Sequence, residues 1–429
     1  MNLIDKNKDQ VIIYPSLLKG SVTLPISKSI AHRVILASAL AEIQGAPPTL
    51  DNIEKQLDNP AEDIVQTLNC GKTLVAHYFA NHYDDNTANH WSEPCQLYCK
   101  DSGTTLRLIL PIACTLFPAV NLTFSEGLAK RPLDPLLTLL KSKGLKFYKK
   151  ENPGGTFTLQ CRGKFQGGHC QIPGDISSQY ISGLLYALPL SDTGGVIELT
   201  TQLTSKPYVD MTLAILRESG IKIKSDLQDG HLTYTLLGKQ QFRQTQHNIS
   251  QGDWSAAAFF AVANALGSQV TMTNLENNHL QGDQEIYSFI DKILKTDEPT
   301  IDLENHPDLF PVLAVLACSK TGTTTFTGVH RLKLKESDRI QSTQAMIESL
   351  KGGDVVIGGC GHSLQVQITG AGHFQSGTVD SFNDHRIAMA AAITACREKG
   401  TVTILNSSCC SKSYPDFFED FRNLGGKID

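Results

Sequence analysis

The segment from Lys335 to Arg339, Lys-Glu-Ser-Asp-Arg, contains two cations and two acids. If this segment is helical, Lys335 and Arg339 lie on one face, where like charges repel by roughly 0.2–0.5 kcal/mol. Such a pair is kept either because both charges reach water or because an anion binds between them. A solvated helix face is the ordinary interpretation of one such pentapeptide. We favour anion binding because similar arrangements recur elsewhere in the chain.

Basic residues stand near the start of several other predicted helices. A cation at a helix N-terminus opposes the helix dipole, whereas the unpaired N–H groups there bind anions readily. This excess of basic residues at helix starts therefore predicts a site for substrates that carry several phosphates and carboxylates. The whole chain nevertheless has a net charge of −5. The residues concerned are Lys28, Arg33, Arg107, Arg131, Lys335, Arg339, Arg386 and Lys412.

Uncharged donors accompany these cations. Ser29 follows Lys28, and Gly103 would let a ligand approach the backbone closely. Three further donors, Ser177-Ser178-Gln179, stand at a helix start, where they are either N-caps or ligands of a substrate. Ser205 and Tyr208 flank a Lys-Pro pair in a predicted loop before the helix at residues 209–218.

Two acids are candidates for proton transfer. Asp308 follows Pro307 just before an apolar helix, so a helix cap and a catalytic group are both open interpretations. Glu336 lies inside the charged segment from Lys335 to Arg339. The pKa values of both carboxyls would be set by the surrounding cations. A third acid, in the row Asp384-His385-Arg386, needs partners if it is buried.

The elements that would position these residues form a weak repeat. Six times, a small or polar cap precedes a run with helical character, and most starts are roughly 75 residues apart. The six helical runs span residues 30–41, 106–116, 180–190, 256–266, 309–318 and 387–396. Alternating segments rich in Val, Ile and Thr predict strands at 11–14, 21–24, 156–160, 195–200, 269–273, 323–327 and 401–405. The pattern favours a repeated α/β unit with buried helices, in two domains of three units each.

Composition excludes several classes of protein. A chain of 429 residues is long enough for two domains, and its 41% hydrophobic and 19% charged residues are typical of a globular protein. The acidic net charge disfavours nucleic-acid binding, and no run reaches the ~18 apolar residues that span a membrane. Eleven cysteines without a CxxC pair favour free thiols in the cytoplasm over a zinc site. No P-loop or complete dinucleotide-binding motif occurs, and we expect no site residue between residues 43 and 96.

Taken together, these motifs resemble the enolpyruvyl transferases, in particular those that act on shikimate 3-phosphate. The resemblance covers residues 24–418, with all of its motifs in the expected order. It implies a two-domain inverted α/β barrel-like fold with three βαβαββ-type units per domain. One domain would comprise residues 1–20 and 250–429 and the other residues 21–249, with the active site in the cleft between them. It also implies an open form that closes on its substrates, and neither a metal nor an organic cofactor.

The resemblance further implies a reaction and a set of site residues. The 5-hydroxyl of shikimate 3-phosphate would attack C2 of phosphoenolpyruvate, and phosphate would leave in a second step. Asp308 would take the hydroxyl proton and Glu336 would protonate C3, with Lys28 and Lys412 as further proton-transfer candidates. Shikimate 3-phosphate would meet Lys28, Ser29, Arg33, Ser177, Ser178, Gln179, Ser205, Tyr208, Asp308 and Lys335. Phosphoenolpyruvate would meet Lys28, Gly103, Arg131, Gln179, Arg339, Arg386 and Lys412. We expect a monomer without macromolecular partners, and glyphosate as a competitor of phosphoenolpyruvate near Gly103.

Two alternatives remain open on sequence alone. The related transferases that act on UDP-N-acetylglucosamine usually have Lys-Asn at the first helix and a cysteine shortly before the Arg-Pro, whereas this chain has Lys28-Ser29 and no cysteine in residues 124–130. A non-catalytic anion-binding protein on the same scaffold would be expected to have lost one of the proton-transfer groups. Two positions depart from the pattern: Ile26 replaces a glycine, and Arg331 stands where an asparagine often contacts the substrate. Residues 44–95 match it poorly.

Overall fold

The computed structural model describes residues 9–82, 93–228, 230–245, 247, 249–277, 280–397 and 399–429. These residues divide into two compact units. Unit 1 contains residues 9–27, Asn59–Ala61 and the described part of Gln251–Asp429, and unit 2 contains Lys28–Asp58 and the described part of Glu62–Ser250. The chain thus passes between the units after Ser27 and after Ser250, and Asn59–Ala61 is a short return to unit 1. The family resemblance implied junctions after residues 20 and 249.

Two four-stranded sheets in unit 2 repeat the order β-α-β-α-β-β along the chain. The first contains β3 (Cys95–Lys100), β4 (Ala119–Ser125), β5 (Lys146–Asn152) and β6 (Thr156–Arg162), in the spatial order β3-β4-β6-β5. The second contains β7 (Gly168–Ile172), β8 (Gly195–Leu199), β9 (Ile223–Gln228) and β10 (His231–Leu236), in the order β7-β8-β10-β9. In both sheets the first two strands are parallel and the other pairs antiparallel. The helices between strands are α4 (Gly103–Leu116), α5 (Glu126–Ala129), α6 (Asp134–Ser142), α7 (Ser178–Ala187) and α8 (Lys206–Glu218), with the 3₁₀ turn η1 (Leu188–Leu190) after α7.

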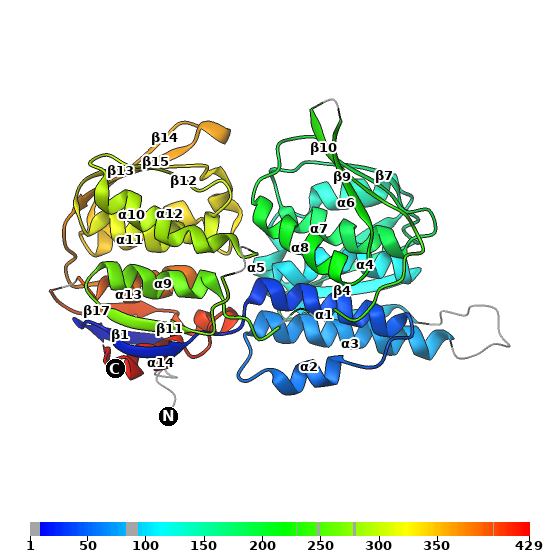
Figure 1. Ribbon diagram of the computed structural model, residues 1–429, viewed down its shortest axis with the longest axis horizontal. Helices are drawn as coiled ribbons and strands as arrows, with labels where there is room; N and C mark the ends of the chain where they lie inside the picture. Colours follow the sequence, from blue (N-terminus) through cyan, green and yellow to red (C-terminus); the bar gives the residue numbers. More distant parts are fainter. Residues whose placement is uncertain are drawn as a thin grey trace. The chain divides into compact units, whose positions relative to one another are not determined.

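The N-terminal part of unit 2 is helical where the repeat would have strands. It consists of α1 (Lys28–Ile43), α2 (Leu50–Gln56) and α3 (Glu62–His82), drawn in blue in Figure 1. No helix or strand is predicted from the sequence between residues 44 and 94. In α3, however, the buried residues Ile64, Leu68, Gly71 and Leu74 recur every three or four positions, which is the helical period. A Cβ on Gly71 would lie 3.5 Å from side-chain carbons on α1, so this glycine lets the two helices pack closely.

Unit 1 contains two further four-stranded sheets and a two-stranded one. The strands β12 (Thr300–Asp302), β13 (Thr321–Thr327), β14 (Gly353–Gly358) and β15 (Gln365–Ala371) form one sheet in the order β12-β13-β15-β14. In the other, β16 (Gly377–Asp380) and β17 (Val402–Leu405) are followed by β1 (Gln10–Tyr14) and β18 (Lys427–Ile428). The strands β2 (Lys19–Thr23) and β11 (Gln269–Thr273) pair in parallel. Segments from both ends of unit 1 in the sequence therefore share two of its sheets.

The helices of unit 1 are α9 (Trp254–Ala265), α10 (Ile286–Lys295), α11 (Phe310–Cys318), α12 (Arg339–Ser349), α13 (His385–Thr394) and α14 (Phe417–Asn423). Short 3₁₀ turns lie at η2 (Gly282–Glu285), η3 (Pro307–Leu309), η4 (His330–Leu334), η5 (Gly361–Ser363) and η6 (Ser407–Lys412). All six helical runs predicted from the sequence are present, as α1, α4, α7 with η1, α9, η3 with α11, and α13. The seven predicted strands are also present.

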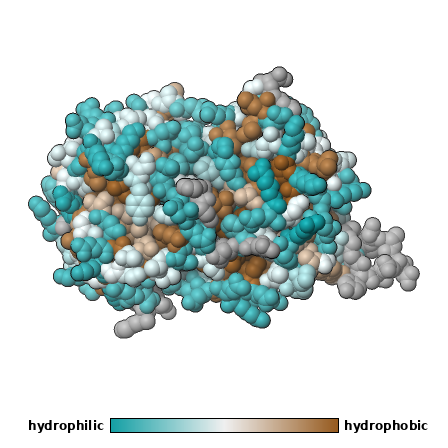
Figure 2. Space-filling view, in the orientation of Figure 1, coloured by the Kyte–Doolittle hydropathy of each residue, from teal (hydrophilic) through white to brown (hydrophobic). Residues whose placement is uncertain are grey.

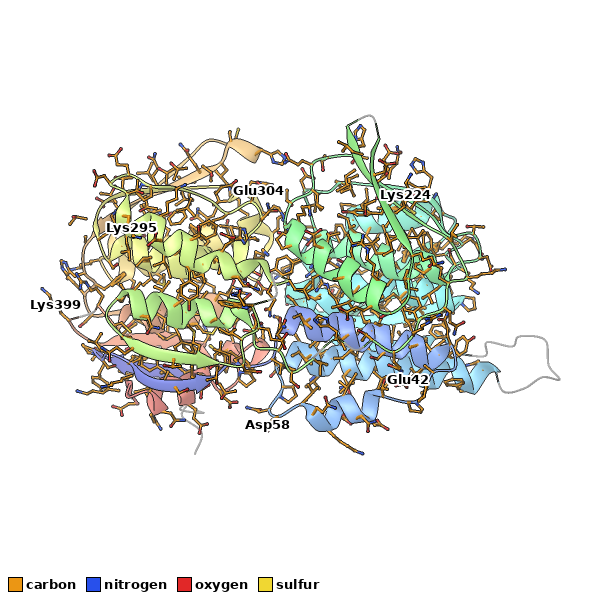
Figure 3. All side chains as sticks on the ribbon, viewed as in Figure 1. Glu42, Asp58, Lys224, Lys295, Glu304 and Lys399 are labelled. Atoms are coloured by element: carbon orange, nitrogen blue, oxygen red, sulfur yellow. The ribbon has the colours of Figure 1, made fainter. Side chains whose placement is uncertain are left out.

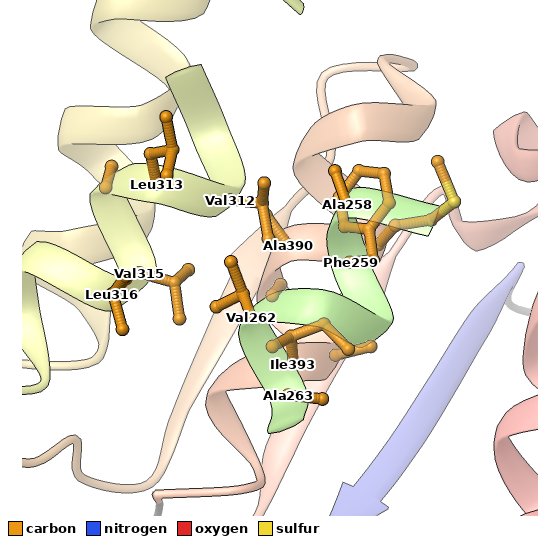
Figure 4. Packing of buried hydrophobic residues seen from close by; sticks show 14 of the residues in the cluster. Ala258, Phe259, Val262, Ala263, Val312, Leu313, Val315, Leu316, Ala390 and Ile393 are labelled. Carbon is orange, nitrogen blue, oxygen red and sulfur yellow. The ribbon is translucent and has the colours of Figure 1, made fainter. Parts of the chain in front are cut away.

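The core of unit 1 lies where α9, α11 and α13 meet between its two larger sheets (Figure 1). Val262, Val315 and Ile393 are completely buried there, and small residues such as Ala258 and Ala390 let the helices approach closely (Figure 4). Burying each Val, Leu or Ile side chain contributes about 1.5–3 kcal/mol. The apolar character of these helices on all sides follows from this position, as the sequence predicted.

Polar side chains cover most of the visible face in Figure 2. Exposed charges such as Lys224 and Lys295 pair with neighbouring aspartates on the outside of their units (Figure 3). Glu42 is an exception, because its buried carboxylate accepts bonds from the N–H groups of Thr49 and Leu50 at the start of α2. None of the helices in the described ranges is long and apolar enough to cross a bilayer.

Candidate active site

In unit 1, the carboxylate of Asp308 is surrounded by three cations. Its Oδ1 lies 3.2 Å from Lys335 Nζ and 2.5 Å from Arg339 Nη1, and its Oδ2 lies 3.2 Å from Arg386 Nη2. The contacts join residues that are 27, 31 and 78 positions apart in the chain. The sequence interpretation of Asp308 as a helix cap finds no support, since no side-chain cap bond is made at the start of η3 or α11.

The charged segment that contains Lys335 and Arg339 is not helical throughout. Lys335 follows η4 in an extended conformation, and α12 begins only at Arg339, with Asp338 as its N-cap. Lys335 and Arg339 therefore do not lie on one helix face. Both are paired with the carboxylate of Asp308, which lies between them. Binding of a substrate anion by this pair stays a prediction.

The surrounding charges shift the pKa values of this cluster. Burial alone would raise the pKa of Asp308, but Arg386, Lys335 and Arg339 hold it well below its usual range. Burial lowers the pKa of Lys335 to about 8, although Asp308 opposes this effect. Asp308 is thus ionised but a weak base while its cations stay paired with it, and Lys335 is a cation that mildly basic pH can discharge.

Glu336 and Lys412 complete the candidate residues of unit 1. The Oε2 atom of Glu336 lies 2.6 Å from Arg339 Nη2, and the Glu336 side chain is 23% exposed. Lys412, at the end of η6, donates to the carbonyl oxygen of Asn383 at 3.3 Å, just before α13 and Arg386. Unit 1 therefore joins five of its six candidates in one network of ion pairs, namely Asp308, Lys335, Glu336, Arg339 and Arg386. Lys412 is held at the loop before α13 through Asn383.

In unit 2, Arg33 is the most deeply buried candidate cation. Its Nε donates to Thr212 Oγ1 at 2.7 Å, Nη1 to the Ser29 carbonyl at 2.7 Å, and Nη2 to the Tyr208 carbonyl at 2.9 Å. These acceptors are neutral, and burial lowers the Arg33 pKa to about 10. Within the described ranges no carboxylate pairs with Arg33. A buried guanidinium without a counter-ion is costly, which favours an anionic ligand here.

A second group in unit 2 is built around the start of α4. Ser102 caps α4, and a Cβ on Gly103 would come within 2.8 Å of the guanidinium nitrogens of Arg107 and Arg131. Arg107 donates to the side-chain oxygen of Gln179 at 2.9 Å and to the carbonyl of Pro132 at 3.0 Å. The sequence interpretation of Arg107 as an anion ligand is therefore incomplete, because Arg107 also ties the Arg131–Pro132 segment to α7.

The remaining donors of unit 2 stand at the starts of α7 and α8. Ser177 is the N-cap of α7 and Ser178 its buried first residue. The Gln179 amide donates to Thr104 at 2.8 Å, which connects α7 to α4. Ser205 precedes α8 with a positive φ of 51°, a conformation that costs a non-glycine residue on the order of 1 kcal/mol. Such strain is often kept at functional sites.

One acid outside the predicted residues pairs with a candidate cation. Asp63, in the first turn of α3, lies 2.9 Å from Lys28 Nζ, and both side chains are mostly buried. The expectation that residues 43–96 hold no site residue stays untested, but one of them pairs with a candidate residue. The available signal was an acid in the first turn of an amphipathic helix, but α3 itself was not predicted. Behind it, a buried hydrogen-bond chain of His32, Thr67 and Thr105 joins α1, α3 and α4.

The two departures from the family pattern have different surroundings. Ile26 forms an isolated antiparallel bridge with Gly252, which keeps the backbone before Lys28 extended. Arg331 is buried in η4, where its charge contributes to the lowered pKa of Lys335. No group of three or more His, Cys, Asp or Glu side chains suited to a metal ion occurs in the residues that the structure describes.

Comparison with known proteins identifies the family of this chain. The family model of EPSP synthase (3-phosphoshikimate 1-carboxyvinyltransferase) matches residues 13–421. The chain belongs to the EPSP synthase family. Curated members of this enzyme family include the 3-phosphoshikimate 1-carboxyvinyltransferase of Clostridium novyi, which is 34% identical over 98% of both chains. The protein of the same name from Clostridium acetobutylicum is 35% identical over 97% of this chain and 98% of its own.

Solved structures show the same fold. An EPSP synthase from Acinetobacter baumannii superposes with a TM-score of 0.69 at 23% identity, covering 98% of this chain and 99% of that one. The enolpyruvyl transferase NikO from Streptomyces tendae gives a TM-score of 0.66 at 15% identity and the same coverage. The two-domain enolpyruvyl transferase fold expected from the sequence is therefore confirmed.

Proposed function

We propose that this member of the EPSP synthase family transfers the enolpyruvyl group of phosphoenolpyruvate to the 5-hydroxyl of shikimate 3-phosphate and releases phosphate. Membership of the family supports the reaction. The observation that carries the proposal is the cluster that Asp308 forms with Lys335, Arg339 and Arg386. It gathers one acid and three anion-binding groups, all of them residues that the sequence singled out.

The two units would contribute different contacts to the same pair of substrates. In unit 2, the residues that would bind shikimate 3-phosphate lie at the starts of three helices: Lys28, Ser29 and Arg33 at α1, Ser177, Ser178 and Gln179 at α7, and Ser205 and Tyr208 at α8. Lys28, Gly103, Arg131 and Gln179 of this unit would bind phosphoenolpyruvate. In unit 1, Asp308 and Lys335 would contact the first substrate, and Arg339, Arg386 and Lys412 the second.

The proposed chemistry depends on which ion pairs of unit 1 the substrates would break. The carboxylate of phosphoenolpyruvate would compete with Asp308 for Arg339 and Arg386. Loss of these cations would raise the pKa of Asp308 and make it a better base for the 5-hydroxyl proton. Glu336 would protonate C3, with Lys28 and Lys412 as additional proton-transfer groups. Holding both anions in reacting geometry contributes through orientation and charge stabilisation.

The direct test measures phosphate release by the purified protein with phosphoenolpyruvate and either shikimate 3-phosphate or UDP-N-acetylglucosamine. Release with shikimate 3-phosphate alone is the expected result. Release with the sugar nucleotide alone would overturn the proposed substrate. Release with neither substrate would contradict the proposed reaction.

A variant tests the role of Glu336. Glu336→Gln should reduce turnover by at least about a hundredfold, because the amide cannot supply the C3 proton. Binding of shikimate 3-phosphate, measured by calorimetry, should be retained. Turnover close to that of the wild type would remove Glu336 from the mechanism.

We further propose that the protein works as a monomer in the cytoplasm. All eleven cysteines are free thiols that form no disulfide, which suits a reducing compartment. Light scattering on the purified protein tests the oligomeric state, and a mass of two or more chains would contradict it.

A further inference from the structure

Asp384 is a completely buried carboxylate that contacts both arginines of the unit 1 cluster. Its Oδ2 accepts from Arg339 Nε at 2.8 Å and from the Ser337 hydroxyl at 3.2 Å. Its Oδ1 accepts from the backbone N–H of Arg386 at 3.0 Å and from Arg339 Nη2 at 3.3 Å. One side chain thus caps α13 and also binds the first residue of α12.

Arg339 pairs with three carboxylates that differ in exposure. The side chain of Asp308 is 15% exposed and that of Glu336 is 23% exposed, whereas Asp384 is 0% exposed. The first two acids are partly open to solvent, and in the proposed mechanism Asp308 gives up Arg339 to phosphoenolpyruvate while Glu336 donates a proton to C3. Asp384 lies beyond the reach of a substrate, so its bond with Arg339 can persist when the other two bonds are broken.

We propose that Asp384 is a positioning residue for phosphoenolpyruvate binding. It fixes the orientation of the Arg339 guanidinium and, through the N-cap of α13, the backbone at Arg386. The inference rests on the proposed function, because it assumes that these two arginines bind the carboxylate of phosphoenolpyruvate. Asp384 itself touches neither substrate.

Asp384→Asn separates the two contacts of the carboxylate. The amide oxygen can keep the cap bond to the Arg386 N–H, since asparagine is as good an N-cap as aspartate. The amide NH₂ then takes the place of Oδ2 and faces the Nε–H of Arg339, which is a contact between two donors. The guanidinium must move, while the helix start is preserved.

The experiment compares Asp384→Asn with Asp338→Asn, measuring kcat, KM for each substrate and thermal stability. Asp338 caps α12 next to Arg339, and its carboxylate accepts from the backbone N–H groups of Ile340 and Gln341. The control removes the same charge from a second N-cap, directly before Arg339 in the chain. For Asp384→Asn we expect kcat/KM for phosphoenolpyruvate to fall about ten- to a hundredfold, with binding of shikimate 3-phosphate retained. Equal kinetics for the two variants would overturn the proposal.

A double-mutant cycle with Arg339→Lys tests whether Asp384 acts through Arg339. If it does, adding Asp384→Asn to Arg339→Lys should cost much less than it costs the wild type. Additive losses would contradict the proposal. If Asp384→Asn fails to fold, Asp384→Ser keeps a cap residue that this chain uses at Ser102 and Ser177 and should give the same kinetic result.

These outcomes are distinct from a failure of the proposed function. Absence of turnover in the wild type with both substrates would overturn the function itself. A fully active wild type together with an unimpaired Asp384→Asn variant would overturn only the role of Asp384.

Discussion

At the scale of single residues, the candidate cations have different partners in the two units. In unit 1, Asp308 occupies the position between three cations that an anionic substrate would seek. In unit 2, Arg33 donates to neutral oxygens. Under the proposed function, an anionic substrate would replace an internal ion pair in unit 1, whereas it would supply a missing counter-charge in unit 2.

The pKa of Lys335 gives a prediction about pH. Because this pKa is about 8 in the substrate-free protein, Lys335 is charged below that pH and largely neutral above it. A charged lysine binds an anion better, so the affinity for shikimate 3-phosphate should fall as the pH rises through 8. Calorimetry over this range measures the effect. Lys335→Arg should remove it, because arginine stays charged; an identical pH dependence in that variant would contradict the assignment.

Gly103 gives a second prediction at this scale. In Gly103→Ala, the added Cβ would lie 2.8 Å from Arg107 Nη1 and Arg131 Nη1, so both guanidinium groups must shift. KM for phosphoenolpyruvate should rise and inhibition by glyphosate should weaken, by about tenfold if one charge-assisted hydrogen bond is lost. Inhibition assays at fixed substrate concentration measure this change. Unaltered inhibition would show that Gly103 does not line the site.

At the scale of elements, helix starts carry most of the candidate residues. Ser102 and Ser177 cap α4 and α7, and Asp338 and Asp384 cap α12 and α13. Capping satisfies N–H groups that would otherwise be unpaired. Cations and hydroxyls at these helix N-termini lie close to the positive end of each helix dipole, where an anion is favoured. Close packing of these helices depends on small residues at their contacts.

Two glycines inside helices should respond in opposite ways to alanine. A Cβ on Gly71 would lie in ordinary contact at 3.5 Å from Ala39 and Ile35, so Gly71→Ala should stabilise the protein by up to about 1 kcal/mol through helix propensity. A Cβ on Gly183 would come within 2.6 Å of the Arg107 carbonyl oxygen, so Gly183→Ala should destabilise by about 1–3 kcal/mol. Denaturant unfolding measures both changes. The same sign for both variants would contradict the packing argument.

At the scale of the whole molecule, each unit has its own set of sheets and buried helices, and the chain passes from one to the other and back. The candidate residues for shikimate 3-phosphate are divided between the units. Ser178 belongs to unit 2, whereas Lys335 belongs to unit 1. A substrate bound by both should lose affinity when either unit is altered.

This division can be tested with one variant in each unit. Ser178→Ala and Lys335→Met should each weaken binding of shikimate 3-phosphate by roughly tenfold, the effect of losing a hydrogen bond to a charged group. Ser142→Ala is the control, because Ser142 is no candidate residue and its hydroxyl donates to the Leu139 carbonyl at the end of α6. Calorimetry measures the three affinities. Loss of affinity in only one of the two unit variants would show that a single unit binds this substrate.

The sequence by itself determined six helical runs, seven strands and the order of the motifs, because periodicity, caps and turn residues are local properties. It did not reveal α3 or the pairing of Asp63 with Lys28, since residues 43–96 were given no element. Only the tertiary structure decided which acid meets which cation. The contacts of Asp308 span up to 78 residues, and those of Asp384 with Arg339 span 45. Such pairings depend on how helices pack against one another, which no local pattern encodes.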